Sequence, residues 1–168
     1  QHSDLYIADY SQEQILSFFE EVVLRVEYSD GTGDDSRVQK WLSPLYYQFY
    51  GSYTDADISK LNELFTQLNQ IEGFPGIYPV TETTQENLEI NFLTPDDLTD
   101  QFYEVINGEN AYGAVQYWYY TDINEMYYAR IGYRTDLDQL TRDSILLEEI
   151  VNALGITDTE MRPDSIVY

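Results

Sequence analysis

The sequence contains no cysteine and a single histidine, His2. The lack of cysteine excludes disulfides and thiol chemistry, although it does not fix the cellular compartment. One histidine cannot supply the three nitrogen ligands of an ordinary catalytic zinc centre, so such a centre cannot form within one chain. Positive charge is also scarce: 8 Lys and Arg stand against 31 Asp and Glu, and the net charge is −23. This acidity serves solubility, disfavours nucleic acid, and favours cations or basic partners.

No apolar run approaches the roughly 20 residues that a membrane-spanning helix requires, so no membrane span is expected. A chain that starts at Gln1 is typical of a mature secreted protein and equally of a trimmed fragment. Seventeen tyrosines in an acidic, lysine-poor chain favour an extracellular protein. We therefore expect a secreted or cell-surface protein.

The length of 168 residues predicts a single domain, 1–168. Its first part, 1–36, reads as a helix followed by an acidic loop. Ser11 and Gln14 form a capping-box pattern at the start of that helix. Three aspartates and two glycines in 29–36 do not match the spacing of a calcium-binding EF-hand loop, so a flexible acidic loop is expected there.

The remaining part, 37–168, alternates strand and helix patterns. Strands are expected at 41–51, with Pro44 at an edge or bend, and at 87–93. Thr54 and Asp57 begin a long helix whose apolar stripe runs to Gly73. The segment 94–112 is irregular, with one short helix around 98–106. Strands at 114–121 and 125–134 form a hairpin, so the fold class is α+β, with a mixed sheet of four to five strands.

The C-terminal segment from Arg142 onward contains the residues that are most informative about function. Apolar residues at helical spacing lead to Gly155, which suits the position after a helix because glycine adopts positive φ without strain. Glu148 and Asn152 are four residues apart and share one helix face. A turn at Gly155 can bring Asp158 back toward that face.

This segment resembles the metzincin metallopeptidase signature, H-E-x-x-H-x-x-G-x-x-H or -D, with both histidines replaced. The resemblance places Glu148, Asn152 and Asp158 at the zinc-ligand positions and Glu149 at that of the general base. The chain also resembles a family of uncharacterised, zincin-related secreted bacterial proteins. The tail of the sequence, Ser165, Ile166, Val167 and Tyr168, resembles the Met-turn of the metzincins, with Val167 where methionine is expected. The resemblance implies a twisted sheet with two long helices on one face.

The motif admits several interpretations. In the first it is vestigial, its carboxylates held by a partner such as Arg142, and the protein is a non-catalytic binding or scaffold module. In the second, three oxygen ligands hold Ca²⁺, Mg²⁺ or Mn²⁺, and Glu149 acts as the base of a peptidase-like hydrolase. A metal-free couple of Glu148 and Glu149 is a poor geometry, because adjacent helix residues diverge by about 100°. The remaining alternative is that Glu148 and Glu149 lie on an ordinary solvated helix surface and have no specific function. The first interpretation is favoured, with no cofactor and no ordinary zinc chemistry.

Aromatic residues crowd the predicted hairpin, which makes it a candidate platform for a peptide, protein or glycan ligand. Alternation along the strand puts Tyr117 and Tyr119 on one face and Trp118 and Tyr120 on the other. Ordinary sheet packing also explains tyrosines there, and it is the favoured interpretation. In zincins the edge strand beside the cleft binds extended peptide by strand addition, and the resemblance implies that this hairpin is the counterpart of that strand. The candidate platform residues are Tyr117, Trp118, Tyr119, Tyr120, Tyr127 and Tyr128.

Overall fold

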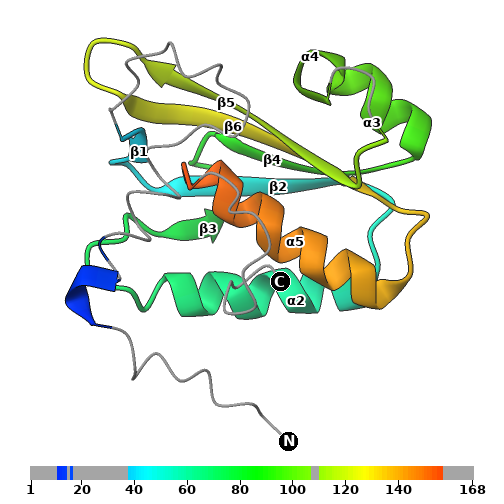
Figure 1. The fold of residues 1–168 in the computed structure, drawn as a ribbon, viewed down its shortest axis with the longest axis horizontal. Coiled ribbons are helices and arrows are strands. Elements are labelled where there is room, and N and C mark those ends of the chain that lie inside the picture. Colours follow the sequence, from blue (N-terminus) through cyan, green and yellow to red (C-terminus); the bar gives the residue numbers. More distant parts are fainter. Residues whose placement is uncertain (1–10, 15, 17–37, 107–109, 157–168) are drawn as a thin grey trace, which may run out of the picture.

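The computed structural model describes residues 11–14, 16, 38–106 and 110–156. These residues form a single six-stranded sheet with helices on both faces (Figure 1). Along the sheet the order is β5-β6-β4-β2-β3, and β1 pairs with the start of β6. Every neighbouring pair is parallel except β5 and β6. The strands are β1 (Lys40–Trp41), β2 (Leu45–Gly51), β3 (Ile77–Pro79), β4 (Leu88–Leu93), β5 (Gly113–Tyr120) and β6 (Glu125–Arg134).

The helices form two unequal layers. The long helices α2 (Asp55–Leu68) and α5 (Gln139–Ala153) lie on one face of the sheet, as expected (Figure 1). The short helices α3 (Pro95–Gln101) and α4 (Tyr103–Ile106) cover one end of the other face, where a single helix around 98–106 was expected. Thr94 starts α3 earlier than expected because its hydroxyl accepts the Asp97 N–H at 3.2 Å.

The prediction of four to five strands was wrong, for two physical reasons. The expected strand 41–51 divides at Pro44 into β1 and β2, which have different neighbours. Asn87 stabilises this break, because its amide donates to the Pro44 carbonyl at 3.0 Å and accepts from the Tyr46 N–H at 2.6 Å. The three-residue strand β3 was missed, since it is too short for a periodic pattern and ends in Pro79.

The predicted start of α2 is confirmed in atomic detail. The Thr54 hydroxyl accepts the Asp57 N–H, and the Asp57 carboxylate accepts the Thr54 N–H at 2.8 Å. This capping box satisfies donors that the first helical turn leaves without partners. The helix ends at Leu68, before the expected stop at Gly73, which has φ +86° in the turn that follows.

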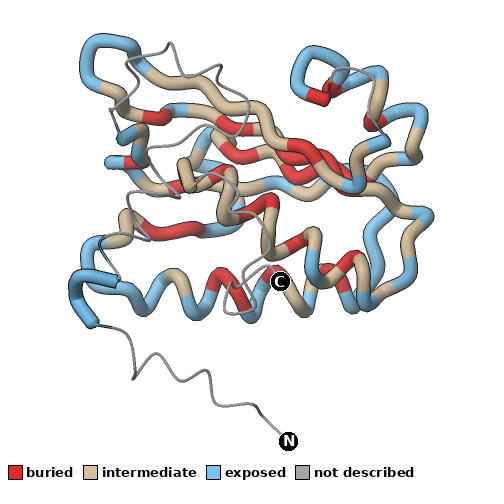
Figure 2. The backbone as a smooth tube through the Cα atoms, viewed as in Figure 1, coloured by how far each residue is buried: buried red, intermediate tan, exposed pale blue. Residues whose placement is uncertain are grey.

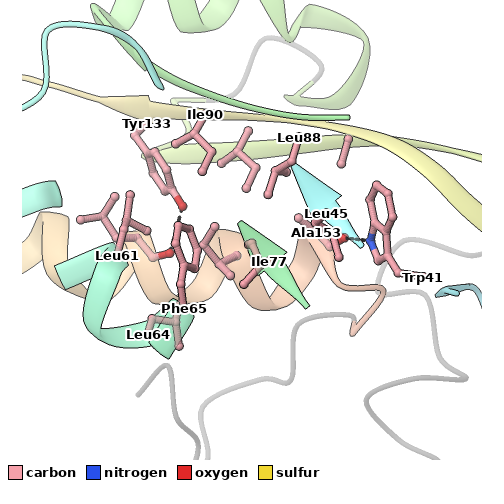
Figure 3. Close-up of a cluster of buried hydrophobic side chains, with 14 of the residues drawn as sticks. Trp41, Leu45, Leu61, Leu64, Phe65, Ile77, Leu88, Ile90, Tyr133 and Ala153 are labelled. Carbon is pink, nitrogen blue, oxygen red and sulfur yellow. Dashed lines mark hydrogen bonds between the residues drawn. The ribbon is translucent and has the colours of Figure 1, made fainter. Parts of the chain in front are cut away.

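The main core lies between the sheet and the layer of α2 and α5 (Figures 2 and 3). Alternate side chains of β2, β4 and β6 point into it and meet Leu61, Leu64 and Phe65 of α2. Trp41 is buried beside this core and donates from Nε1 to the Ala153 carbonyl at 2.9 Å, which ties β1 to the end of α5 (Figure 3).

A second, smaller core lies on the opposite face, under α3 and α4. It consists of Leu98, Phe102, Ile106 and Ala114. Gly132 permits this packing, because a Cβ there would collide with Leu98 and Phe102. The sheet is therefore buried on both faces at the end where α3 and α4 lie.

The N-terminal expectations are tested only in part. The Ser11 N–H donates to Gln14 Oε1 at 2.8 Å, and the Gln14 N–H donates to the Ser11 hydroxyl at 3.2 Å, which confirms the capping box. The rest of that predicted helix beyond residue 16 and the acidic loop at 29–36 lie outside the described residues.

Candidate functional site

The helix that carries the motif, α5, begins at Asp138 and ends in a Schellman turn. The Asp138 carboxylate accepts the Thr141 N–H at 3.1 Å. At the other end, Gly155 donates to the Asn152 carbonyl and Ile156 donates to the Val151 carbonyl. Gly155 has φ +93°, which confirms the positive φ expected there. Glycine is required for a second reason, since a Cβ would collide with the Gln39 carbonyl.

Glu149, the candidate base, is buried between α5 and β5. It lies against Gly113 so closely that a Cβ on Gly113 would overlap the glutamate side chain. Asn152 Nδ2 is 3.5 Å from Glu149 Oε2, and both Glu148 and Asn152 are half-buried. The structure therefore places Glu149 and Asn152 in contact, with Glu148 beside them on the same helix.

The pKa of Tyr133 on β6 is affected by the negative charges near this helix. Its hydroxyl is buried and donates to the Leu146 carbonyl at 2.9 Å. Burial raises the Tyr133 pKa well above its usual value of 10.0, and the nearby carboxylates of Glu149, Glu148 and Asp57 raise it further. Both glutamates of the motif therefore contribute to the raised pKa of this buried tyrosine.

Arg142 was a candidate partner for the motif carboxylates, but it pairs with Asp57 of α2. Nε donates to Oδ1 at 3.1 Å, Nη2 donates to Oδ2, and Nη1 donates to the Thr135 carbonyl at 3.0 Å. The guanidinium and the carboxylate are both buried. Arg142 therefore joins the two long helices.

The metal hypothesis rests on residues that the structure describes only in part. Asp158, Ser165, Val167 and Tyr168 lie outside the described residues. Within the described ranges, no group of three or more His, Cys, Asp or Glu side chains has the arrangement of a metal site. An oxygen-ligated cation remains a prediction, to be tested by binding.

The six aromatic residues of the hairpin divide between its surfaces. Tyr117 and Tyr119 face α5 and pack against the main core, as alternation predicts. Trp118 and Tyr128 contact each other on the other face, with ring centroids 5.4 Å apart. Tyr120 and Tyr127 are exposed near the hairpin tip, with centroids 4.5 Å apart. A β-bulge in β6 leaves Tyr127 without a paired residue on β5, because Trp118 pairs with Tyr128 and Tyr119 pairs with Met126.

A polar network on the face away from α5 was missed from the sequence. Glu89 of β4 accepts from Arg130 Nε at 2.9 Å and from the Tyr128 hydroxyl. Arg130 also lies over the Phe102 ring, 5.3 Å from its centroid. Glu89 and Arg130 are directly paired in the parallel register of β4 and β6. Strand alternation indicates which face each occupies, but only the non-local pairing brings them together.

The two edges of the described sheet differ. At the β3 edge, the Asn69 side chain accepts the Ile77 N–H at 2.8 Å and donates to the Ile77 carbonyl at 2.9 Å, so both backbone groups are occupied. At the other edge, β5 has eight residues, no charge and no proline, and pairs among the described strands with β6 alone. Natural proteins usually protect edges of this kind, because an unprotected edge can pair with a strand of another chain. Of the two edges, β5 is therefore the one suited to strand addition.

Fold and site together define a domain of mixed α/β class, where the sequence predicted α+β, with a mostly parallel sheet, one antiparallel edge strand and an acidic helix beside that edge. The chain belongs to the family described as a protein of unknown function (DUF2927), whose model matches residues 12–168. Comparison with curated proteins and with solved structures finds no match. In the described part of the chain, no helix is both long and apolar enough to cross a membrane.

Proposed function

We propose that this protein is a zincin-like binding module that takes an extended peptide along the edge of β5. The observation that carries the proposal is the contrast between the two sheet edges, with the β3 edge occupied by Asn69 and the β5 edge long and uncharged. Strand addition uses backbone hydrogen bonds for affinity and alternate side chains for selectivity.

The zincin-like part of the proposal is supported by element order. A strand, a long helix, a strand, a hairpin and a second long helix follow one another as β2, α2, β4, β5–β6 and α5. Both long helices lie on one face, and β5 is the antiparallel edge strand beside the helix with the motif. The positive φ of Gly155 agrees with the turn that the motif requires.

The register determines which β5 groups point outward. The Tyr112 carbonyl accepts the Arg134 N–H at 3.1 Å, so positions 112, 114, 116 and 118 bond to β6. The N–H and carbonyl groups of Gly113 and Val115 consequently point toward the edge. These are the groups that an added strand would bond.

Charge favours a basic partner over a second copy of the chain. Two copies would each bring a net charge of −23, and like charges oppose their association. A basic segment gains from the same field. The proposed ligand is therefore an extended basic segment of another protein.

Val115→Pro tests the proposal, because proline removes an outward N–H while an edge strand tolerates it. Val115→Thr is the matched control, since threonine has a similar shape and keeps the N–H. The probe is a decapeptide of alternating Thr and Lys, with binding measured by calorimetry and the amide hydrogen exchange of Gly113 and Val115 by NMR. We expect the peptide to slow exchange in the wild type and in Val115→Thr, and Val115→Pro to lose binding at least 10-fold. Equal binding by the two variants, or unchanged exchange in the wild type, would overturn the proposal.

A further inference from the structure

The face of the β5–β6 hairpin that is turned away from α5 carries three successive pairs of side chains, which we call the hairpin strip. The two residues nearest the tip are 51% and 42% exposed, and their ring centroids are 4.5 Å apart. The residues of the second and third pairs are half-buried. From the tip inward the pairs are Tyr120 with Tyr127, Trp118 with Tyr128, and Gln116 with Arg130.

The hairpin strip ends where the second core begins. The next pair inward is Ala114 with Gly132, and these two residues lie under Leu98 and Phe102. Four residues separate Tyr120 from the polar pair on the same strand, which at about 3.4 Å per residue gives a length of about 14 Å. The strip is therefore long enough for a ligand of a few ring units.

The inner end of the strip is polar, held in place and electrically balanced. Glu89 accepts from Arg130 Nε at 2.9 Å and from the Tyr128 hydroxyl, so its negative charge offsets that of the guanidinium. The Arg130 side chain is 27% exposed, and among the described residues its Nη1 group donates to no protein atom. The half-buried Gln116 adds an amide with donors and an acceptor. This end therefore offers planar hydrogen-bonding groups without excess charge.

From this arrangement we propose that the hairpin strip binds a neutral oligosaccharide. A sugar ring has an apolar C–H face and a rim of hydroxyls, each of which both donates and accepts. The C–H faces would stack on Trp118 and Tyr127, whose rings present apolar surface with a polar edge. The hydroxyls of the next ring would bond to Gln116 and to Nη1 of Arg130. Such a site, mostly apolar with a few placed polar groups, is typical of small-ligand sites.

Two observations favour a neutral sugar over other ligands of aromatic surfaces. The net charge of −23 opposes anionic sugars, and the one cation of the strip is already paired with Glu89. A proline-rich segment has few N–H donors, so it would leave the Gln116 carbonyl without a partner. The site uses side chains of the open face and is separate from the outward backbone groups of the β5 edge.

The probes are four neutral hexasaccharides: α-1,4-linked glucose and β-1,4-linked glucose, mannose and N-acetylglucosamine. Binding to the full chain is measured by calorimetry, and the Trp118 indole N–H resonance is followed by NMR. We expect at least one hexasaccharide to bind and to shift this resonance. Its affinity should change less than about twofold between low and high salt, because the ligand carries no charge.

Two variants locate the site. Trp118→Leu should weaken binding by about 10-fold, because it removes the central ring. Tyr127→Thr changes an exposed residue, so the fold should persist, and it should weaken binding by about threefold. Tyr103→Leu is the matched control, since it removes an exposed aromatic ring from α4, outside the strip, and should leave the affinity unchanged.

The proposal fails if none of the four hexasaccharides shifts the Trp118 resonance. If decaproline shifts it and no saccharide does, the strip binds a proline-rich segment and the proposal is overturned. A loss of affinity in Tyr103→Leu equal to that in Trp118→Leu would place binding elsewhere and refute the site. Protection of the Gly113 and Val115 amides by the Thr–Lys peptide should persist in Tyr127→Thr, so strand addition is tested separately.

Discussion

Arg142 of α5 donates two hydrogen bonds to the Asp57 carboxylate on α2, from Nε to Oδ1 at 3.1 Å and from Nη2 to Oδ2. The same carboxylate accepts from Gln139 and caps α2 through Thr54. No buried side-chain nitrogen or oxygen in the described residues lacks a hydrogen-bond partner. This ion pair therefore joins the two long helices. Because both groups are buried, removing one of them would leave the other charge without a partner and would destabilise the fold.

Arg142→Met should lower the free energy of unfolding by about 3–5 kcal/mol at pH 7, because it leaves a buried carboxylate without its countercharge. Urea unfolding measures the loss. Asp57→Leu combined with Arg142→Met removes both charges and should recover part of the stability. A double variant no more stable than Arg142→Met would contradict the assignment of the loss to an uncompensated charge.

Asp57 should make stability depend on pH in the acid range. Burial raises its pKa, but hydrogen bonds from Thr54 and Gln139 and the charge of Arg142 outweigh burial, so the pKa lies below 3.8 in the folded state. A depressed carboxyl pKa contributes stability that is complete above the unfolded value of about 3.9 and is lost as pH falls through the folded value. The difference in free energy of unfolding between the wild type and Asp57→Asn should become smaller below about pH 4.

Substitutions at Gly155 and Gly73 distinguish the energetic cost of backbone strain from the cost of steric overlap. Both have positive φ, +93° and +86°, but a Cβ at Gly73 meets nothing within 4 Å, whereas one at Gly155 collides with the Gln39 carbonyl. Gly73→Ala should cost about 1 kcal/mol through φ alone. Gly155→Ala should cost at least about 1 kcal/mol more, and Gly155→Val more again. Equal losses in thermal unfolding would show that the contact with Gln39 does not constrain the turn.

Tyr50 should titrate late because of Glu86. Its hydroxyl donates to Glu86 Oε2 at 2.7 Å, and this bond, together with burial and the charges of Glu86 and Glu89, raises its pKa to about 12. Glu86→Gln should move the Tyr50 pKa toward 10.0, as followed by the ¹³Cζ chemical shift. Glu82→Gln removes an exposed carboxylate nearby and should leave the titration in place. An unchanged Tyr50 pKa in Glu86→Gln would refute the pairing.

Metal binding should be absent at the motif if the binding-module proposal is right. Elemental analysis of the purified protein and calorimetry with Ca²⁺, Mg²⁺, Mn²⁺ and Zn²⁺ should detect no stoichiometric site that depends on Glu148. Glu148→Ala provides the comparison. Stoichiometric binding that disappears in this variant would favour the hydrolase alternative, with Glu149 as general base, and would justify a substrate screen.

Local signals predicted much of the fold. Thr54 with Asp57 and Ser11 with Gln14 gave correct capping boxes because each is a contact between residues three apart. The alternation of apolar and polar residues in β4 and the helix-ending role of Gly155 could likewise be predicted from short segments of the sequence. Such features depend on neighbours in sequence, so the sequence alone specifies them.

Long-range relationships could not be predicted in the same way. Nothing near Arg142 in sequence indicates Asp57 as its partner, and nothing near Asn69 indicates that its amide occupies the edge of β3. The division at Pro44 also depends on Asn87, from a different strand segment. The candidate site was located on α5 by its motif, but its position against Gly113 required the pairing of β5 with β6.

The position of β6 has a consequence for how the chain acquires its structure during synthesis. β6 is the last of the described strands in sequence, yet it pairs with β1, β4 and β5. Until the ribosome has released residue 134, β4 lacks one neighbour and residues 40 and 41 have none of their final strand partners. Parallel pairing between distant segments is slow, and incomplete sheets expose apolar surface. A nascent chain of this protein is therefore exposed to aggregation until β6 emerges, and the described residues that precede β6 cannot form the native sheet alone.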